Sequence, residues 1–466
     1  MNEDFGRRRY VKMFLAVVDI TIVFTGFILA NGILQQFSIM NMELIVDYSW
    51  LIVVSAASVV PLYLYDLYTD WRRKGIHHLV YSIVLSMIIF SGLESIISLL
   101  TPYLPFQPSY ILAAFLIQTT LLTCFHVCVW YINKKLFGKK KVYIIGEASN
   151  AGLYLAGKLL NHHNGWFEIE GFIPLEKKRN LHEYVKKCDL FLLSPAINRK
   201  DCEEIARVCI RYGKEILMVP QLFELSFIGA NTQQIDDMLV VSIKPPLLNV
   251  SQKISKRIFD VMVSAVLLVI ASPFFMILFF LIPLTSKGPA FFKQERIGLD
   301  GKPYWIYKFR SMIQDAEKRT GPVLATDKDP RITLVGRIIR AVRLDELPQL
   351  INVLKGEMSL VGPRPEREYF INQFKQTLPD YPYRLTVKPG ITGLAQVLAN
   401  YTTPVEDKLR FDLLYVRNYS FTLDIKILFQ TIRVVLQREQ AQGVKEGSIY
   451  NQKLLKRLEK NKVMNH

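Results

Sequence analysis

Long apolar runs constrain the fold of this chain more than any other feature. The first four lie at Val11–Leu34, Leu44–Tyr65, His78–Leu100 and Ser109–Ile132. Each is long enough to cross a bilayer, which takes about 20 apolar residues in a helix. The first run is too long for a cleaved signal peptide, and three similar runs follow it. The sequence therefore predicts a four-helix transmembrane bundle over residues 1–135.

The charges that flank these runs are one-sided. Basic residues lie at Arg7–Lys12, Arg72–Lys74 and Lys134–Lys141, whereas the loops at 35–43 and 101–108 contain no Lys or Arg. The positive-inside rule therefore places both ends of the bundle in the cytoplasm. The formal net charge of +17 with 50% hydrophobic residues fits a membrane protein with basic cytoplasmic surfaces and argues against a nucleic-acid-binding protein.

Three acidic residues, Asp19, Asp47 and Glu94, lie within or at the edge of these runs. Acids at membrane depth often mark a functional site. Partners on neighbouring helices explain them equally well, so both readings stay open.

Residues 139–250 predict a Rossmann-like α/β domain with a parallel sheet, because strand and helix patterns alternate there. A strand begins at Lys141, and further elements are expected at Glu168–Ile173, Asp189–Leu193, Lys200–Tyr212 and Glu215–Val219. The turn after the first strand has glycines at 146 and 152 but lacks the full GxGxxG spacing. It is weak as a dinucleotide site, and a nucleotide-fold domain kept for regulation or assembly explains it at least as well.

A further apolar run, Phe259–Leu284, follows a polar basic linker. Both of its flanks are basic, with Arg257 before it and Lys287 after it, so both ends are expected in the cytoplasm. Ser272-Pro273 lies at its middle, where proline interrupts the helical hydrogen bonds. We therefore expect a re-entrant helix-break-helix over residues 251–285 that enters one leaflet. The alternative is an ordinary fifth span with a tolerated proline.

Two adjacent carboxylates, Asp345 and Glu346, stand out in the last third of the chain. Arg340 and Arg343 precede them, a proline follows two residues later, and Gly356 closes the next apolar run. This pattern predicts that the acids lie at the start of a helix. Asp345 is suited to attack phosphorus as a nucleophile, and Glu346, on another face of the helix, to hold Mg²⁺. A capped surface helix with paired charges is the alternative.

Several cations suggest a pocket for a multiply charged anion. Arg364 lies between Pro363 and Pro365, which fix the backbone and favour bidentate binding of phosphate. Lys308 and Arg310 are two residues apart and are expected on one side of a strand. A structural turn and a basic stripe that faces lipid headgroups are the alternatives. The expected pocket cations are Lys308, Arg310, Arg340, Arg343, Arg364 and Lys388.

Glycines 390 and 393 suit a tight loop whose amides approach a phosphate. No cysteine follows Cys209, and the only histidine after His182 is the terminal His466. Chemistry in the C-terminal half would therefore depend on carboxylates, hydroxyl groups, Lys and Arg. The cysteines show no zinc-ligand spacing and indicate a reducing compartment.

The segment from Lys256 to Gln437 resembles the bacterial sugar transferase family. The resemblance rests on Lys256-Arg257 with Asp260, Ser272-Pro273, Gly288-Pro289 with Gln294, Arg296 and Gly298, Lys308–Met312, Leu344–Gln349, Gly362–Pro365 and Lys388–Gly393. It implies that Asp345 attacks the β-phosphate of a UDP-sugar, that UMP leaves, and that undecaprenyl phosphate then takes the phospho-sugar in a ping-pong mechanism. It further implies that Glu346 binds Mg²⁺ and that Ser272-Pro273 breaks the re-entrant helix. Arg343 departs from the family pattern, because many members carry a small hydroxyl residue there.

The resemblance also bears on the whole chain. The first half looks like the extension of large members that start exopolysaccharide, capsule or O-antigen synthesis. It implies a mainly α catalytic domain over residues 286–466, with a basic tail, on the cytoplasmic face of the bacterial inner membrane, and a homodimer. UDP-glucose or UDP-galactose is the expected donor, with the choice between sugars expected to involve Leu394–Asp412.

Two rival functions remain from the sequence. One is a non-catalytic membrane scaffold or regulator of polysaccharide assembly that senses lipid phosphate. The other is a membrane-bound nucleotide-sugar dehydratase, which would require a full GxGxxG turn and a Tyr-x-x-x-Lys pair. The turn at Gly146 lacks the first of these, and no convincing case of the second is present.

Overall fold

The computed structural model describes residues 2–36, 48–69, 75–100, 107–146, 150–162, 166–243, 245, 247–314, 316, 329–400 and 403–437. Two compact units emerge, one formed mainly by Met1–Val219 and the other by Pro220–Ser448. Several expected features lie outside the described residues: the basic group Arg72–Lys74, Asp47, the basic tail, and most of the loops at 35–43 and 101–108.

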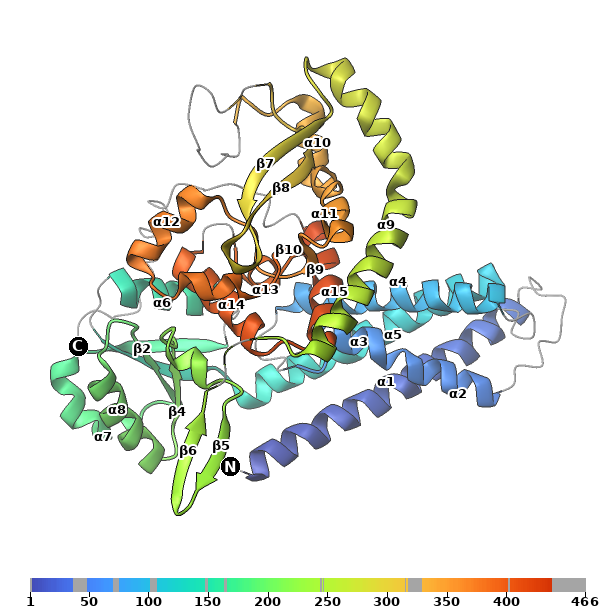
Figure 1. Cartoon of the computed structure of the whole chain (residues 1–466). Coiled ribbons are helices and arrows are strands. Elements are labelled where there is room, and N and C mark those ends of the chain that lie inside the picture. Colours follow the sequence, from blue (N-terminus) through green and yellow to red (C-terminus); the bar gives the residue numbers. More distant parts are fainter. Residues whose placement is uncertain are drawn as a thin grey trace. The chain divides into compact units, whose positions relative to one another are not determined.

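The first unit begins with apolar helices (Figure 1). Three of them are long and apolar enough to cross a membrane: α1 (Asn2–Gln36), α4 (Ile76–Leu100) and α5 (Pro108–Phe137). The second expected span, Leu44–Tyr65, is described from Tyr48 on and consists there of two short apolar helices, α2 (Tyr48–Ala57) and α3 (Val59–Leu64). Pro61 has no N–H to donate to the carbonyl of Ala57, which interrupts the hydrogen-bond ladder there.

Asp19 of α1 is fully buried and has partners on other segments. The Tyr68 hydroxyl donates to its Oδ2 at 2.8 Å, and His126 Nε2 of α5 lies 2.9 Å from its Oδ1. A buried carboxylate needs such partners to offset its lost hydration. These contacts favour the interhelical reading of Asp19 over a functional one.

The remainder of the first unit is an α/β region with a parallel four-stranded sheet, which confirms the parallel sheet expected there. The strands lie in the order β2 (Phe167–Ile173), β1 (Lys140–Ile145), β3 (Leu190–Leu193) and β4 (Glu215–Met218). Ile144 and Ile145 belong to different apolar clusters, because successive strand residues face opposite sides of a sheet. One cluster includes side chains of α6 (Asn150–His162), and the other includes side chains of α7 (Leu181–Val185) and α8 (Arg199–Arg211).

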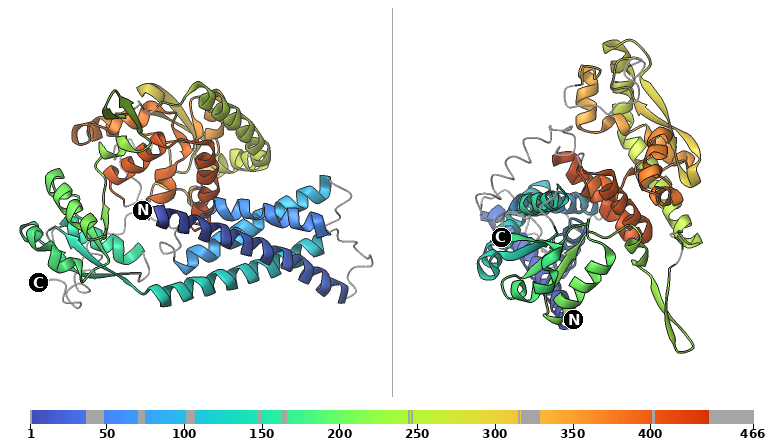
Figure 2. Two further views of the ribbon diagram at one scale, coloured as in Figure 1. Left: turned by 90° about the horizontal axis from the view of Figure 1, so that it is seen from below. Right: turned by 90° about the vertical axis from the view of Figure 1, so that its left-hand side faces the viewer.

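The second unit begins at Pro220, thirty residues before the boundary expected at 250. Leu225 packs in one cluster with Leu409 and Leu413, and Arg410 Nε donates to the Pro220 carbonyl at 2.8 Å. The expected α/β domain of 139–250 extends past this boundary, because Pro220 and Leu225 contact residues of the second unit. This segment includes a hairpin of β5 (Asn231–Ile235) and β6 (Met238–Ser242), which projects away from the helices of its unit (Figure 2).

The apolar run after the hairpin forms one helix, α9 (Val250–Thr285), which is also long and apolar enough to cross a membrane. The expected break at Ser272-Pro273 is wrong, since the helix continues through both residues and bends along its length (Figure 1). Pro273 leaves the carbonyl of Val269 without its helical donor, and the Ser272 hydroxyl donates to that carbonyl at 2.7 Å. The serine thus satisfies a group that would be costly to leave unpaired in lipid, and the helix persists.

The rest of the second unit is mainly α, as expected. Its helices are α10 (Leu334–Ala341), α11 (Gln349–Lys355), α12 (Glu368–Thr377), α13 (Leu394–Leu398), α14 (Val405–Arg417) and α15 (Phe421–Gln437). Two strand pairs accompany them, the antiparallel β7 (Phe291–Ile297) with β8 (Pro303–Phe309) and the parallel β9 (Ser359–Val361) with β10 (Gly390–Thr392).

Gly390 and Gly393 do not form a loop open to a phosphate, contrary to expectation. A Cβ on Gly390 would lie 2.1 Å from the Gly362 amide nitrogen, and one on Gly393 would lie 2.2 Å from the Gly362 carbonyl oxygen. These glycines let two backbone segments pack against each other beside β9 and β10.

Candidate active site

The adjacent carboxylates lie in a turn between two helices of the second unit. After α10, Asp345 and Glu346 fall within the short 3₁₀ helix Leu344–Glu346, and α11 begins at Gln349. Pro348 is the N-cap of α11, and Gly356 ends it with φ +86°. The expected helix start and stop are confirmed, although the acids precede α11 in a turn of their own.

Glu346 is 8% exposed and lies among three cations. Lys308 Nζ donates to its Oε1 at 2.9 Å, and Arg364 Nη2 lies 3.4 Å from the same oxygen. Arg343 Nη1 lies 3.6 Å from the other oxygen, Oε2. Burial alone would raise the pKa of Glu346, but Lys308, Arg364 and Arg343 outweigh it and hold that pKa well below its usual range.

The pKa of Asp345 moves in the opposite direction. Burial and the neighbouring charge of Glu346 raise it to about 6, against the opposing effects of Lys308, Arg340 and Arg364. One carboxylate of the pair is thus held as an anion, while the other titrates near neutrality. Environments that separate two adjacent pKa values in this way are typical of acids with different roles in one site.

Arg364 is held in place through its backbone from two sides. Arg384 Nη2 donates to the Arg364 carbonyl at 2.8 Å, and Arg296 Nη1 donates to the Pro365 carbonyl at 3.2 Å. Arg384 is itself fixed by a buried ion pair with Asp412, at 2.7 Å. The two prolines of this loop, Pro363 and Pro365, are buried, whereas the Arg364 side chain is 43% exposed. These hydrogen bonds hold the backbone of the loop, and the Arg364 guanidinium lies between Glu346 and solvent.

Sequence reasoning missed Arg384 and Asp412. No local motif links them, since they are 28 residues apart and lie in a 3₁₀ helix and in α14. The family pattern marked Arg296 without a role, and its contact with Pro365 now supplies one.

Two of the expected pocket cations have neighbours other than the acid pair. Arg310 is buried and donates to the carbonyls of Ser286 at 2.6 Å and Gly288 at 3.1 Å, and also to that of Lys287. Lys388 lies beside Gly356, at the end of α11 opposite to Glu346. Lys308 and Arg364 therefore contact the acid turn (Leu344–Glu346), and Arg340 acts on it through its charge. Substrate binding by Arg310 and Lys388 stays a prediction.

Glu346 is the residue of the acid pair that would hold the expected magnesium ion. Among the described residues, no group of three or more His, Cys, Asp or Glu side chains is placed to hold a metal by itself. Mg²⁺ in phosphate-transfer sites commonly takes one or two carboxylates, and substrate oxygens and water complete its shell. Glu346 offers an anionic carboxylate whose oxygens already face cations.

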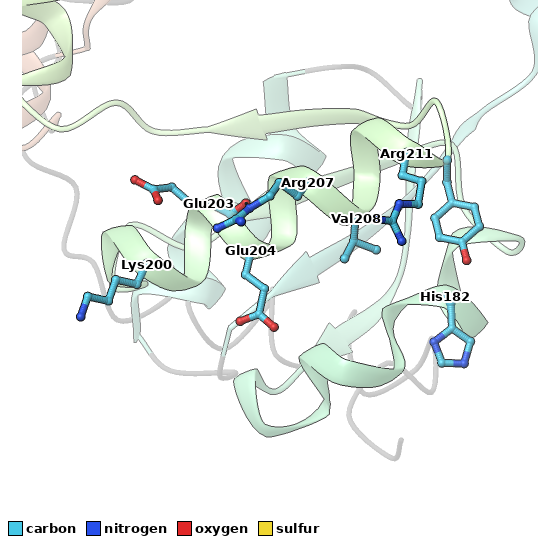
Figure 3. A pocket seen from close by; sticks show the side chains of 8 residues that line it. His182, Lys200, Glu203, Glu204, Arg207, Val208 and Arg211 are labelled. Carbon is cyan, nitrogen blue, oxygen red and sulfur yellow. The ribbon is translucent and has the colours of Figure 1, made fainter.

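A groove in the first unit is separate from this site. Its volume is about 660 Å³, and its lining consists of His182, Lys200, Glu203, Glu204, Arg207, Val208, Arg211 and Tyr212. The two glutamates point to different sides of α8 (Figure 3). Glu203 also pairs with Arg199 at 3.2 Å. This mixed, solvated set of charges offers no counterpart to the paired carboxylates of the second unit.

Comparison with known proteins agrees with this geometry. Residues 251–438 match the family described as "Bacterial sugar transferase". An undecaprenyl-phosphate galactose phosphotransferase of Salmonella typhimurium is 39% identical, over 66% of this chain and 71% of the relative. A UDP-glucose:undecaprenyl-phosphate glucose-1-phosphate transferase of Escherichia coli is 28% identical, over 91% and 94%.

A third relative matches a smaller share of the chain. The UDP-N-acetylgalactosamine-undecaprenyl-phosphate N-acetylgalactosaminephosphotransferase of Aeromonas hydrophila is 45% identical over 39% of this chain. The chain spans less than half of that relative's length, at 43%. The family match, the Salmonella relative and the acid turn together show that the chain belongs to the bacterial sugar transferase family.

Proposed function

We propose that the protein transfers a hexose 1-phosphate from a UDP-sugar to undecaprenyl phosphate and releases UMP. The observation that carries this proposal is the acid turn, where Asp345 and Glu346 have opposite pKa shifts beside Lys308 and Arg364. The relatives support it, because their names give the same lipid acceptor with glucose, galactose or N-acetylgalactosamine donors. Such a reaction is the first membrane step of exopolysaccharide, capsule or O-antigen synthesis.

The reaction proceeds in two displacements at one phosphorus atom. An Asp345 carboxylate oxygen attacks the β-phosphorus of the UDP-sugar, the bond from that phosphorus to the bridging oxygen breaks, and UMP leaves with the bridging oxygen. A phosphate oxygen of undecaprenyl phosphate then attacks the same phosphorus and releases the Asp345 carboxylate. The product is a lipid diphosphate sugar, and the two substrates never need to meet on the enzyme.

The cations around the acid turn reduce the repulsion between an anionic nucleophile and an anionic substrate. Lys308 and Arg364 hold Glu346 by its Oε1, and the charge of Arg340 favours the ionised form of Asp345. Arg364 is exposed enough to reach a substrate phosphate as well, while Arg384 and Arg296 keep its backbone still. Mg²⁺ held by Glu346 would neutralise charge on the diphosphate oxygens.

The second unit lies on the cytoplasmic face of the inner membrane, and α9 enters and leaves the membrane on that same face. Basic residues at both of its ends support this path, among them Arg257 and Lys287. A single cysteine placed beside Lys287 is therefore expected to resist membrane-impermeant maleimide on intact cells and to react after the membrane is opened. Strong labelling of intact cells would make α9 an ordinary span.

The donor sugar is testable with purified protein in detergent. UMP release is expected from UDP-glucose or UDP-galactose when undecaprenyl phosphate is present, and the product should appear in the lipid phase. UDP-N-acetylgalactosamine and UDP-N-acetylglucosamine complete the panel, because one relative is named for an N-acetylated sugar. Release of UMP from none of these donors would contradict the proposed function.

A further inference from the structure

Arg343 has an unusual backbone conformation for its residue type. Among the described residues outside glycine, those with positive φ are Asp66, Asp236, Asp300 and Arg343. Aspartate tolerates the left-handed region because its short side chain bonds locally. Arginine has no such compensation, yet Arg343 adopts φ 55° and ψ 23° beside the paired carboxylates. A backbone conformation that is unfavourable for its residue type persists only where the surrounding structure stabilises it.

The strained residue bridges α10 and the acid turn. Its amide donates to the Arg340 carbonyl at 3.2 Å, and its carbonyl accepts from the Glu346 amide at 3.2 Å. The chain turns back at these two hydrogen bonds, and Arg343 Nη1 lies 3.6 Å from Glu346 Oε2. The contact is an ion pair that is too long for a hydrogen bond.

The two oxygens of Glu346 are held differently. Oε1 accepts a 2.9 Å hydrogen bond from Lys308 and faces Arg364 at 3.4 Å. In the described part of the chain, three cations form ion pairs with Glu346, and of these Arg343 alone faces Oε2. The Arg343 side chain is 33% exposed and that of Lys308 is 19% exposed. Oε2 is thus the oxygen that an incoming metal reaches by displacing one loose, partly solvated contact.

We propose that Arg343 is a positioning residue that covers Glu346 Oε2 in the substrate-free enzyme and gives up this oxygen to a divalent cation. This inference rests on the proposed function, in which Glu346 holds Mg²⁺. It goes beyond that function by assigning a role to the residue that departs from the family pattern. The guanidinium competes with the metal for one oxygen, so Arg343 weakens binding of the free metal and keeps Glu346 paired until substrate arrives.

Three substitutions separate this role from that of a simple turn residue. Arg343→Gln removes the charge and keeps the backbone strain, Arg343→Gly removes both, and Arg343→Lys keeps the charge. If Arg343 competes with the metal, the Gln and Gly variants both bind the metal more tightly and the Lys variant resembles the wild type. If the residue serves the turn alone, none of the three changes metal affinity, and only the relief of backbone strain in the Gly variant alters stability.

The test measures Mn²⁺ binding to the purified full-length protein in detergent, without nucleotide or lipid, from the electron paramagnetic resonance signal of free Mn²⁺. Arg343→Gln and Arg343→Gly are expected to bind Mn²⁺ about five- to tenfold more tightly than the wild type, because a positive charge no longer opposes the ion. Arg343→Lys should stay within about twofold of the wild type. Glu346→Gln serves as the control that should abolish the site.

The outcomes separate this inference from the proposed function. Loss of binding in Glu346→Gln with no change in Arg343→Gln would overturn the inference and leave the metal role of Glu346 intact. Wild-type affinity in Glu346→Gln would remove that metal role, and the inference with it. Absence of measurable Mn²⁺ binding in Arg343→Gln would also count against the inference, since the predicted tightening would not have occurred.

Discussion

Asp345→Asn is expected to reduce both UMP release and lipid product by at least about a thousandfold, since the amide cannot serve as the nucleophile. The substitution keeps the size and shape of the side chain, so the fold should persist. It also leaves Glu346 with its three cations, so metal binding should remain. The measurement is a burst of UMP in the absence of lipid acceptor, where the wild type should release about one equivalent per active site.

Asp300→Asn is the matched control for this substitution. Asp300 is an exposed aspartate in another short 3₁₀ helix, and its own φ is positive, which asparagine tolerates. Its replacement should leave the UMP burst unchanged. Normal turnover in Asp345→Asn would mean that Asp345 is not the covalent nucleophile.

The raised pKa of Asp345 also fixes the expected pH dependence of this burst. With a pKa of about 6, Asp345 is ionised at pH 7 and becomes protonated as the pH falls through 6. The nucleophilic form is therefore lost on the acidic side, and kcat/KM should decline about tenfold per pH unit well below 6. The diphosphate diester of a UDP-sugar does not titrate in this range, so the first half-reaction isolates the enzyme. A flat profile from pH 7 to pH 5 would contradict the assignment.

The sequence predicted those parts of the site that depend on local pattern. Proline and glycine marked the limits of α11, and adjacent acids after two arginines identified the turn. What local pattern cannot supply is which distant cation reaches which oxygen. Lys308 and Glu346 are 38 residues apart, and only the packing of β8 against the acid turn brings them together.

Arg310 illustrates the same limit. It follows Lys308 by two residues, and a regular strand would place both cations on one side. The strand ends at Phe309, however, and Arg310 instead meets the carbonyls that follow the end of α9. Carbonyls at a helix C-terminus lack helical donors and carry partial negative charge, so a buried guanidinium is stable there. The family resemblance marked Arg310 as important, but it did not indicate which contact Arg310 makes.

Lys256→Met is expected to lower the free energy of unfolding of the second unit by about 3–5 kcal/mol, because it leaves a buried carboxylate without its countercharge. Lys256 is 6% exposed, and its Nζ lies 2.5 Å from Asp424 Oδ2 and 3.0 Å from the Val361 carbonyl. Within the described part of the chain, Asp424 would keep the Tyr415 hydroxyl, at 2.8 Å, as its side-chain partner. Urea titration read by pulse proteolysis measures the change. Lys355→Met, the same substitution at an exposed lysine, should stay within about 0.5 kcal/mol of the wild type.

A double variant shows whether the loss comes from the unpaired charge. Lys256→Met with Asp424→Leu should regain most of the lost stability, since a buried ion pair contributes little more than apolar residues that fill the same space. If the double variant is as unstable as Lys256→Met, lost packing is the cause and the ion pair is not. Activity need not return with stability. Val361 directly precedes the Gly362–Pro365 loop, so Lys256 connects the apolar helix α9 to the segment that positions Arg364. A stable double variant with a reduced rate of UMP release would show that α9 aligns the loop that presents Arg364.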